Sequence, residues 1–208
     1  MQSFTLEVPT AGVWWSLFDI YLVLGVLTAV VVFSILIYNV WKYREKNTSA
    51  PRDNKDRGKL GPVIIASFTL FVLFGLAYYT FGAISYMTIP PNQNGAMQIK
   101  VTAFQWGWNF TYPNGKSVLN ELTVPANTTI VLNITSRDVF HSFGIPDFKV
   151  KADAIPGRHN ALWFLAPQQG TFVIRCYELC GVGHSYMVGT LRVLDKRQFQ
   201  QWYGVGGS

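Results

Sequence analysis

Two long runs of residues without any charged side chain constrain the first half of this 208-residue chain. They cover residues 20–41 and 60–89, and each exceeds the ~20 apolar residues that a helix needs to cross a bilayer. A pair of buried helices in a soluble protein is the alternative, but soluble helices rarely exceed ~25 residues without polar interruptions. The sequence therefore predicts a transmembrane hairpin, with spans at about residues 16–41 and 61–88.

The segment between the two runs carries an excess of positive charge. Seven of the seventeen Lys and Arg residues lie in residues 42–60, against three acids. Loops of this kind stay on the cytoplasmic side, so we expect loop 42–60 inside the cell and both termini outside it. No basic residue precedes Lys42, which argues against a cleavable signal peptide. Residues 1–90 are therefore expected to anchor a domain of residues 91–208 outside the cytoplasm.

Residues 91–208 show the pattern of an all-β domain. Strand-like runs rich in β-branched and aromatic residues occupy residues 97–110, 121–124, 128–135, 161–165, 171–176 and 187–194. Pro and Gly residues separate these runs, and a helical period appears only in residues 195–203. Trp106 and Trp108 are two residues apart in the first run, so we expect them to share one face of a strand. Short strands at this spacing predict a sandwich or a small barrel.

Both cysteines of the chain lie in one short segment together with two other possible metal ligands. The segment, CYELCGVGHSYM at residues 176–187, contains Cys176, Cys180, His184 and Met187. His141 offers a second imidazole from a different loop. Thiolates, imidazoles and a thioether form a soft donor set that suits copper.

Several interpretations of this segment stay open from the residues alone. Two cysteines outside the cytoplasm commonly form a disulfide, although a bridge that closes so short a loop would stabilise the fold only weakly. Zinc would use both thiolates and both imidazoles but would leave Met187 without a role. A mononuclear blue-copper site would leave one cysteine over. Two metals bridged by both thiolates, with one histidine each, use every residue.

The segment resembles the dinuclear copper (CuA) loop of subunit II of the haem–copper cytochrome c oxidases, whose pattern is Cys-x-Glu-x-Cys-Gly-x-x-His-x-x-Met. Four further motifs follow the order of that family: QWGW at 105–108, YPNG at 112–115, SRDVFHSF at 136–143 and DAIPGR at 153–158. With the hairpin, they extend the resemblance over most of the chain. It implies a two-helix transmembrane hairpin followed by an all-β cupredoxin-like Greek-key barrel.

The resemblance also implies a set of copper ligands, made of two thiolates, two imidazoles, a thioether and one main-chain carbonyl. These are, in that order, Cys176 and Cys180, His141 and His184, Met187, and Glu178. The thiolates would bridge the two coppers, each imidazole would bind one of them, and the thioether and the carbonyl would be axial ligands. The Glu178 side chain would also help to hold a magnesium or manganese ion against subunit I. Trp106 would be the aromatic residue through which electrons enter from the donor.

The implied function is electron input to a terminal respiratory oxidase of the cell membrane. The copper centre would accept electrons from an external donor, a cytochrome c or a blue-copper protein. It would pass them to haem in subunit I, where O2 is reduced to water and protons are pumped. The chain has only three histidines, too few to hold haems and a further copper besides CuA, so no O2-reducing site is expected on it. The alternatives are a CuA subunit of a nitric oxide reductase and a membrane-tethered copper carrier.

Two departures from the family pattern limit what the resemblance implies. Residues 57–62 (RGKLGP) lack the glutamate that family members often carry near the start of the second span, so no proton-uptake role is assigned to this chain. From residue 88 onward the chain has ten basic and six acidic residues, so we expect a donor that is not strongly basic. The basic residues form no stripe with aromatic side chains, and nucleic acid is not an expected partner.

Three Asn-x-Thr sequences of the exported domain, at Asn109, Asn127 and Asn133, match the acceptor pattern for N-glycosylation. Patterns this short arise often by chance. The sequence alone therefore does not predict which of the three, if any, carries a sugar.

Overall fold

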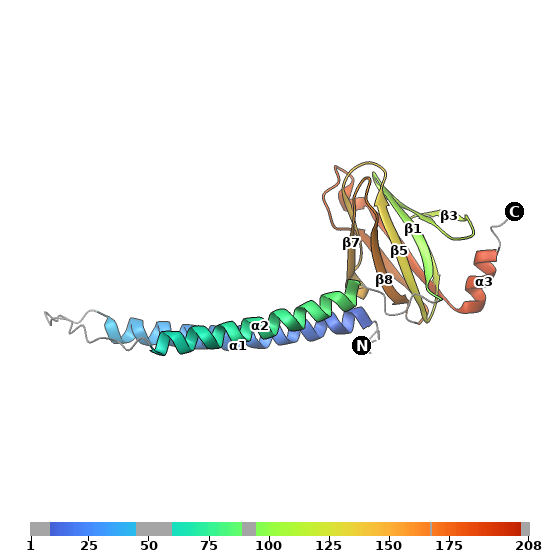
Figure 1. Ribbon diagram of the computed structural model, residues 1–208. Helices are drawn as coiled ribbons and strands as arrows, with labels where there is room; N and C mark the ends of the chain where they lie inside the picture. The colour runs from blue at the N-terminus through green and yellow to red at the C-terminus, as the bar shows by residue number, and fades with distance from the viewer. Residues whose placement is uncertain (1–8, 45–59, 89–94, 167, 205–208) are drawn as a thin grey trace. The chain divides into compact units, whose positions relative to one another are not determined.

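The computed structural model of the protein describes residues 9–44, 60–88, 95–166 and 168–204. Two long helices come first, followed by a series of short strands and a short C-terminal helix (Figure 1). The chain divides into two compact units: Trp15–Gly82, and a second unit that joins Met1–Trp14 to Ala83–Ser208. The first unit is mainly the helical hairpin, and the second contains the sheets.

The helices α1 (Pro9–Tyr43) and α2 (Leu60–Thr88) are 35 and 29 residues long. Both are long and apolar enough to cross a membrane, and protein covers none of their most apolar segments. A helix that is apolar on all sides and uncovered by protein suits a lipid surrounding. The Tyr21 hydroxyl lies 2.7 Å from Oγ1 of Thr80 and links the two helices. The basic loop predicted for the cytoplasmic side falls largely on residues 45–59, outside the described residues.

Two five-stranded sheets form a β-sandwich. The first has the strand order β3-β2-β1-β5-β8 and the second β4-β10-β9-β6-β7. The strands are β1 (Met97–Phe104), β2 (Gly107–Thr111), β3 (Ser117–Leu119), β4 (Glu121–Pro125), β5 (Thr128–Ser136), β6 (His141–Ile145), β7 (Val150–Ala154), β8 (Asn160–Ala166), β9 (Gly170–Cys176) and β10 (Val188–Leu194). Two 3-10 turns, η1 (Pro146–Phe148) and η2 (His184–Tyr186), and the helix α3 (Lys196–Gly204) complete the fold.

Alternating apolar residues along the central strands build the core between the sheets. In the parallel pair β1 and β5, Ile99 lies opposite Leu132 and Val101 opposite Ile134, and all four side chains are fully buried. A strand presents every second side chain to one face, so this register points one whole face at the core. The core fixes the ends of the strands, from which the loops that carry the predicted ligands depart.

The structure confirms the predicted fold class but differs from the predicted strands in two respects. Residues 97–110 form a hairpin instead of one strand, because the chain turns at Gln105 and Trp106 between β1 and β2. Three observed strands, β3, β6 and β7, were not predicted. All five residues of β6 are buried, so the strand lacks the apolar–polar alternation that marks a half-exposed strand. The helix predicted at residues 195–203 corresponds to α3.

Candidate metal centre

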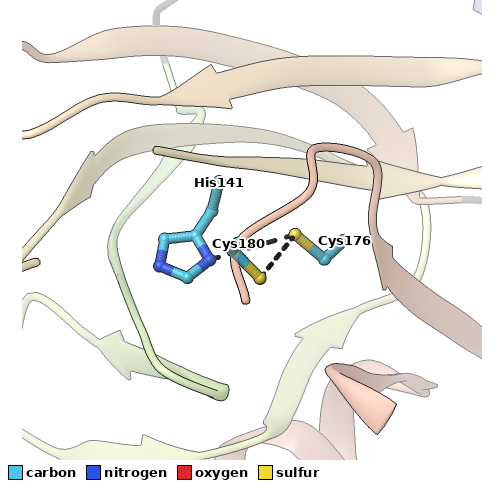
Figure 2. Close-up of side chains that lie close together, drawn as sticks. All are labelled: His141, Cys176 and Cys180. Atoms are coloured by element: carbon cyan, nitrogen blue, oxygen red, sulfur yellow. Dashed lines mark hydrogen bonds between the residues drawn. The ribbon is translucent and has the colours of Figure 1, made fainter. Parts of the chain in front are cut away.

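Two strand ends and the loop between β9 and β10 bring the predicted ligands to one end of the sandwich. His141 is the first residue of β6 and Cys176 is the last residue of β9, and these two strands are antiparallel neighbours. Cys180 and His184 lie in the loop that follows β9, and Met187 directly precedes β10. Figure 2 shows the His141 ring directed toward the two cysteine sulfurs.

The two cysteine sulfurs are neighbours but are not bonded to each other. The Sγ atoms of Cys176 and Cys180 lie 3.9 Å apart, and both residues are free thiols. Both side chains are buried, so the pair is shielded from solvent. The disulfide interpretation is therefore not the arrangement that this structure adopts.

Each sulfur has its own imidazole. Nδ1 of His141 lies 3.9 Å from Sγ of Cys176, and Nδ1 of His184 lies 3.6 Å from Sγ of Cys180. The ligand atoms of His141, Cys176 and Cys180 all lie within 4.8 Å of one another, close enough to hold a metal ion. The arrangement is nearly symmetric, with one sulfur and one nitrogen for each of two positions.

Each sulfur also has one weaker donor beside it. The main-chain carbonyl oxygen of Glu178 lies 3.3 Å from Sγ of Cys176, and Sδ of Met187 lies 3.7 Å from Sγ of Cys180. Met187 is buried, with 1% of its surface exposed. A carbonyl oxygen and a thioether are weak ligands that copper accepts at longer range than thiolate or imidazole. The structure thus brings together all six residues that the family resemblance implies as ligands.

The environment of Cys180 raises the pKa of its thiol. Burial raises its pKa, and the neighbouring Cys176 raises it further, to about 11. The thiol is therefore protonated at neutral pH in the metal-free protein. A metal ion that binds here must release that proton, since the thiolate is the ligand.

Asp138 holds the His141 ring from the side opposite the sulfurs. Its Oδ1 atom lies 2.9 Å from Nε2 of His141, whose side chain is fully buried. The backbone N–H groups of Gln105 and Val139 each donate to the carboxylate at 2.7 Å. Burial alone would raise the pKa of Asp138, but the hydrogen bonds from His141, Gln105 and Val139 outweigh it and lower the pKa to about 2. A charged acceptor at Nε2 directs the lone pair of Nδ1 to the sulfurs.

Asp138 was not predicted to have a role, although it lies in the motif SRDVFHSF at 136–143. The signal was an acid three residues before a predicted imidazole ligand. That spacing alone does not predict a contact, because the chain between the two residues is a loop whose path is fixed only by the sandwich. The hydrogen bond to Gln105 likewise depends on the β1–β2 turn, which was not predicted.

Trp106 and Trp108 do not share a face, contrary to the sequence prediction. Trp106 lies in the β1–β2 turn with 40% of its surface exposed, whereas Trp108 is fully buried on β2. Nε1 of Trp106 donates to the Cys180 carbonyl at 3.3 Å, and Nε2 of Gln105 donates to the same oxygen at 2.8 Å. Trp108 packs edge-on against the rings of His141 and Phe143. Trp106 is thus the tryptophan that reaches from solvent to the ligand loop.

The three possible glycosylation sites differ in their surroundings. Asn109 and Asn133 lie within strands, where their Oδ1 atoms contact the Ser117 hydroxyl at 2.8 Å and Nδ1 of His159 at 2.9 Å. Asn127 is exposed in the turn between β4 and β5, with a positive φ of 51°. A left-handed turn position by itself favours asparagine, so the turn already accounts for this residue.

Known proteins have sequences similar to most of this chain. A family model described as cytochrome c oxidase subunit II, periplasmic domain, matches residues 115–193. The heme-copper oxidase subunit 2 of Aeropyrum pernix is 39% identical over 215 residues, which cover 96% of this chain and 92% of that protein. The cytochrome c oxidase subunit 2 of Cereibacter sphaeroides is 27% identical, over 86% of this chain and 72% of that protein.

A solved structure is similar to the β-sandwich. The periplasmic domain of subunit II of the cytochrome oxidase of Bradyrhizobium japonicum is 38% identical and superposes with a TM-score of 0.51. The match covers 53% of this chain and 92% of that domain.

Proposed function

The chain belongs to the family of subunit II of the haem–copper oxidases, and from that premise we propose that it is the electron-input subunit of a terminal respiratory oxidase. It would take electrons from an external donor at a dinuclear CuA centre and pass them to haem in subunit I. There, O2 would be reduced to water and protons pumped across the membrane. Copper and electron transport follow from the family, whereas the dinuclear centre and its ligands are the proposal.

One observation carries this proposal: two free, buried thiols lie 3.9 Å apart, and each has a separate imidazole beside it. Two equivalent thiol–imidazole pairs suit two metal ions better than one. The carbonyl of Glu178 and the thioether of Met187 continue the pairing, with one on each cysteine. This soft donor set fits two copper ions better than zinc. A structural zinc ion takes four Cys or His ligands in a tetrahedron, so zinc would leave the thioether unused.

When bound, a copper pair supplies one-electron exchange, and the residues of this chain provide a fixed and dry surrounding for it. The fold buries both cysteines, His141 and Met187 away from water, and Asp138 fixes the orientation of the His141 ring. The β-sandwich holds His141 and Cys176 on paired strands, so neither side chain has to move when the charge of the centre changes. Ligands that do not rearrange keep the barrier to electron transfer low.

Trp106 is the residue through which we propose that electrons enter. Its ring is part-exposed, and its Nε1 donates to the carbonyl of Cys180, one of the proposed bridging residues. A donor that touches the exposed edge of the ring would be separated from the ligand loop by one side chain. The donor would be a cytochrome c or a blue-copper protein that is not strongly basic, because basic residues outnumber acids ten to six from residue 88 onward.

The remaining parts of the proposal concern the membrane and subunit I. The hairpin would lie in the cell membrane with the basic loop inside and both termini and the copper domain outside, as the charge distribution predicts. The half-buried Glu178 side chain would help to hold a magnesium or manganese ion against subunit I. Metal analysis of the assembled complex tests this last point: Glu178→Gln should lower the bound magnesium or manganese while copper stays unchanged.

Copper loading of the full chain in detergent tests the central proposal. Absorption and EPR spectra should show a dinuclear copper centre with two copper ions per chain. A colourless protein with a Cys176–Cys180 disulfide would contradict the proposal, and so would one copper per chain with a mononuclear signal. Replacing His141 or Met187 should change the spectrum while the circular dichroism of the sandwich stays the same.

A further inference from the structure

Two glycines of the ligand loop lie against the Trp106 ring, and they are glycines for different reasons. Gly181 has a φ of +118°, a conformation that residues with a side chain rarely adopt. Gly183 has φ −89° and ψ 7°, a sparsely populated region that nonetheless admits residues with a side chain. Backbone conformation therefore explains Gly181 but does not require glycine at position 183.

The ring of Trp106 occupies the space where a side chain at position 183 would begin. A Cβ atom placed on Gly183 would overlap Cδ2 of the indole and would lie 2.6 Å from Cγ and 2.8 Å from Cε2. Real Cβ contacts essentially never fall below 3.0 Å. The three atoms belong to the middle of the ring system and not to its flexible end, so the whole ring would have to move. The indole thus lies directly on the main chain of Gly183.

Both sides of this contact are held in place. Nε1 of Trp106 donates to the carbonyl of Cys180, and the carbonyl of Gly183 accepts the N–H of Tyr186 at 3.0 Å. Gly183 directly precedes His184, whose Nδ1 lies 3.6 Å from the sulfur of Cys180. The ring therefore rests on the short main-chain segment that joins two of the proposed copper ligands.

We propose that Gly183 is a positioning residue for electron transfer. Because it has no side chain, it leaves the space in which the Trp106 ring contacts the loop between Cys180 and His184. This inference rests on the proposed function, because the consequence concerns the electron path through Trp106. Any side chain at position 183 would push the ring outward and strain or break its hydrogen bond to Cys180. The ligands would remain, but the step from Trp106 to the centre would lengthen.

A first experiment measures the contact between Gly183 and the Trp106 ring by NMR, in the absence of copper. The chain has seven tryptophans, so the full chain with 15N-labelled tryptophan in detergent gives at most seven indole signals. The signal that Trp106→Phe removes belongs to Trp106. Gly183→Ala should shift this signal and leave the other six in place. Gly204→Ala is the matched control: among the described residues, nothing beyond its chain neighbours and its own helix backbone lies within 4 Å of the space that its new Cβ would fill, and it should shift none of them. An unmoved Trp106 signal in Gly183→Ala would overturn the proposal.

A second experiment measures electron transfer in copper-loaded chains by rapid mixing with reduced cytochrome c or a reduced blue-copper protein. Gly183→Ala should keep the wild-type absorption and EPR spectra but slow reduction several-fold, because the electron step from the displaced indole to the ligand loop lengthens. In the Trp106→Phe background, Gly183→Ala should cause little further slowing, because the smaller ring leaves room for the methyl group. Equal slowing in both backgrounds would overturn the proposal.

The two experiments separate this inference from the proposed function. If the wild-type chain binds no copper pair or accepts no electrons, the proposed function fails. The indole spectrum still decides whether Gly183 positions the Trp106 ring. If copper binds and the wild-type chain is reduced while Gly183→Ala behaves as wild type, only the inference fails.

Discussion

The end of the sandwich that carries the candidate ligands and the end that carries α3 are held together by different interactions. At the ligand end, loop side chains stay exposed: Leu179 at 78%, Tyr186 at 82% and Val182 at 92%. At the other end, the Tyr112 ring is buried and lies edge-on to Trp202, with ring centroids 5.1 Å apart. The first end leaves apolar side chains exposed, and the second covers its apolar surface with its own helix.

The two ends of the sandwich also differ in the partners of their buried polar atoms. The ligand end places sulfur and imidazole nitrogen atoms 3.6–3.9 Å from one another, an arrangement that a bound metal ion would stabilise. The other end pairs its polar atoms directly: the Tyr112 hydroxyl donates to the Thr123 carbonyl and accepts the Thr123 N–H. We infer that the ligand end is adapted to function and the α3 end to stability. Mutations at the two ends should therefore affect different measurements.

The largest effect is expected from Cys180→Ser, which removes one of the two proposed bridging ligands. A hydroxyl does not replace a thiolate toward copper, so the dinuclear absorption and EPR signals should disappear completely. The circular dichroism of the metal-free sandwich should stay that of the wild type, because the substitution changes one atom. A Cys180→Ser chain that keeps the wild-type copper spectrum would contradict the ligand assignment.

Asp138→Asn should have the second-largest effect, again at the ligand end. The amide cannot accept from His141 and the Gln105 N–H as the carboxylate does, and loss of such an outer contact costs ~10–100-fold in metal affinity. Competition with a copper chelator measures the affinity. Asp147→Asn is the control, since Asp147 is exposed and its substitution should leave the affinity unchanged. Equal affinities for all three proteins would show that Asp138 does not support His141.

Tyr112→Phe tests the α3 end and should lower stability without changing the copper spectrum. Loss of the hydroxyl leaves the fully buried Thr123 with an unpartnered N–H and carbonyl, which costs ~1–3 kcal/mol for each buried group left unsatisfied. Denaturant unfolding followed by near-UV circular dichroism measures the loss. Tyr203→Phe is a matched control, because the bond from the Asn114 N–H to the Tyr203 hydroxyl is exposed and should matter little. A copper spectrum that changes in Tyr112→Phe would contradict the separation of the two ends.

The same residue predicts a dependence on alkaline pH. Burial raises the pKa of Tyr112 above the range of an exposed tyrosine. The folded state therefore disfavours the phenolate, so the stabilisation is complete below the unfolded pKa of ~10 and falls as pH rises above it. In Tyr112→Phe this contribution is absent. The difference in unfolding free energy between the two proteins should therefore shrink when it is measured above pH ~10.

The two apolar helices and most of the candidate ligands could be predicted from the sequence because their residues lie in contiguous segments. A transmembrane helix is a run of apolar residues, and Cys176, Cys180, His184 and Met187 lie within one loop. Their assembly with His141 needed the family resemblance. The resemblance also assigned Trp106 its role, but nothing in the sequence separated it from Trp108, which the structure places in the core.

The contacts that surround the ligands could not be predicted, because they join segments far apart in the chain. The Gln105 side chain donates to the Cys180 carbonyl across 75 positions. Asp138 reaches His141 only because β5 and β6 lie in different sheets and the loop between them takes a particular path. The strand β6 was missed for a related reason: its neighbours bury both of its faces, and no local pattern marks such a strand.

The smallest effect is expected from Lys116→Met, again at the α3 end. Nζ of Lys116 lies 3.9 Å from the centroid of the Trp202 ring and donates to the Trp202 carbonyl at 2.6 Å. A cation near the last carbonyls of a helix is favourable, and a cation over an indole adds ~0.5–1 kcal/mol at an exposed site. Methionine keeps the apolar stem but removes the charge, so the loss should be ~0.5–1 kcal/mol, smaller than for Tyr112→Phe. Lys100→Met, at an exposed position on β1, should cost less. If it costs as much, the contribution of Lys116 is general charge and not its contact with α3, and the stability of this end then rests on its rings and on Tyr112 alone.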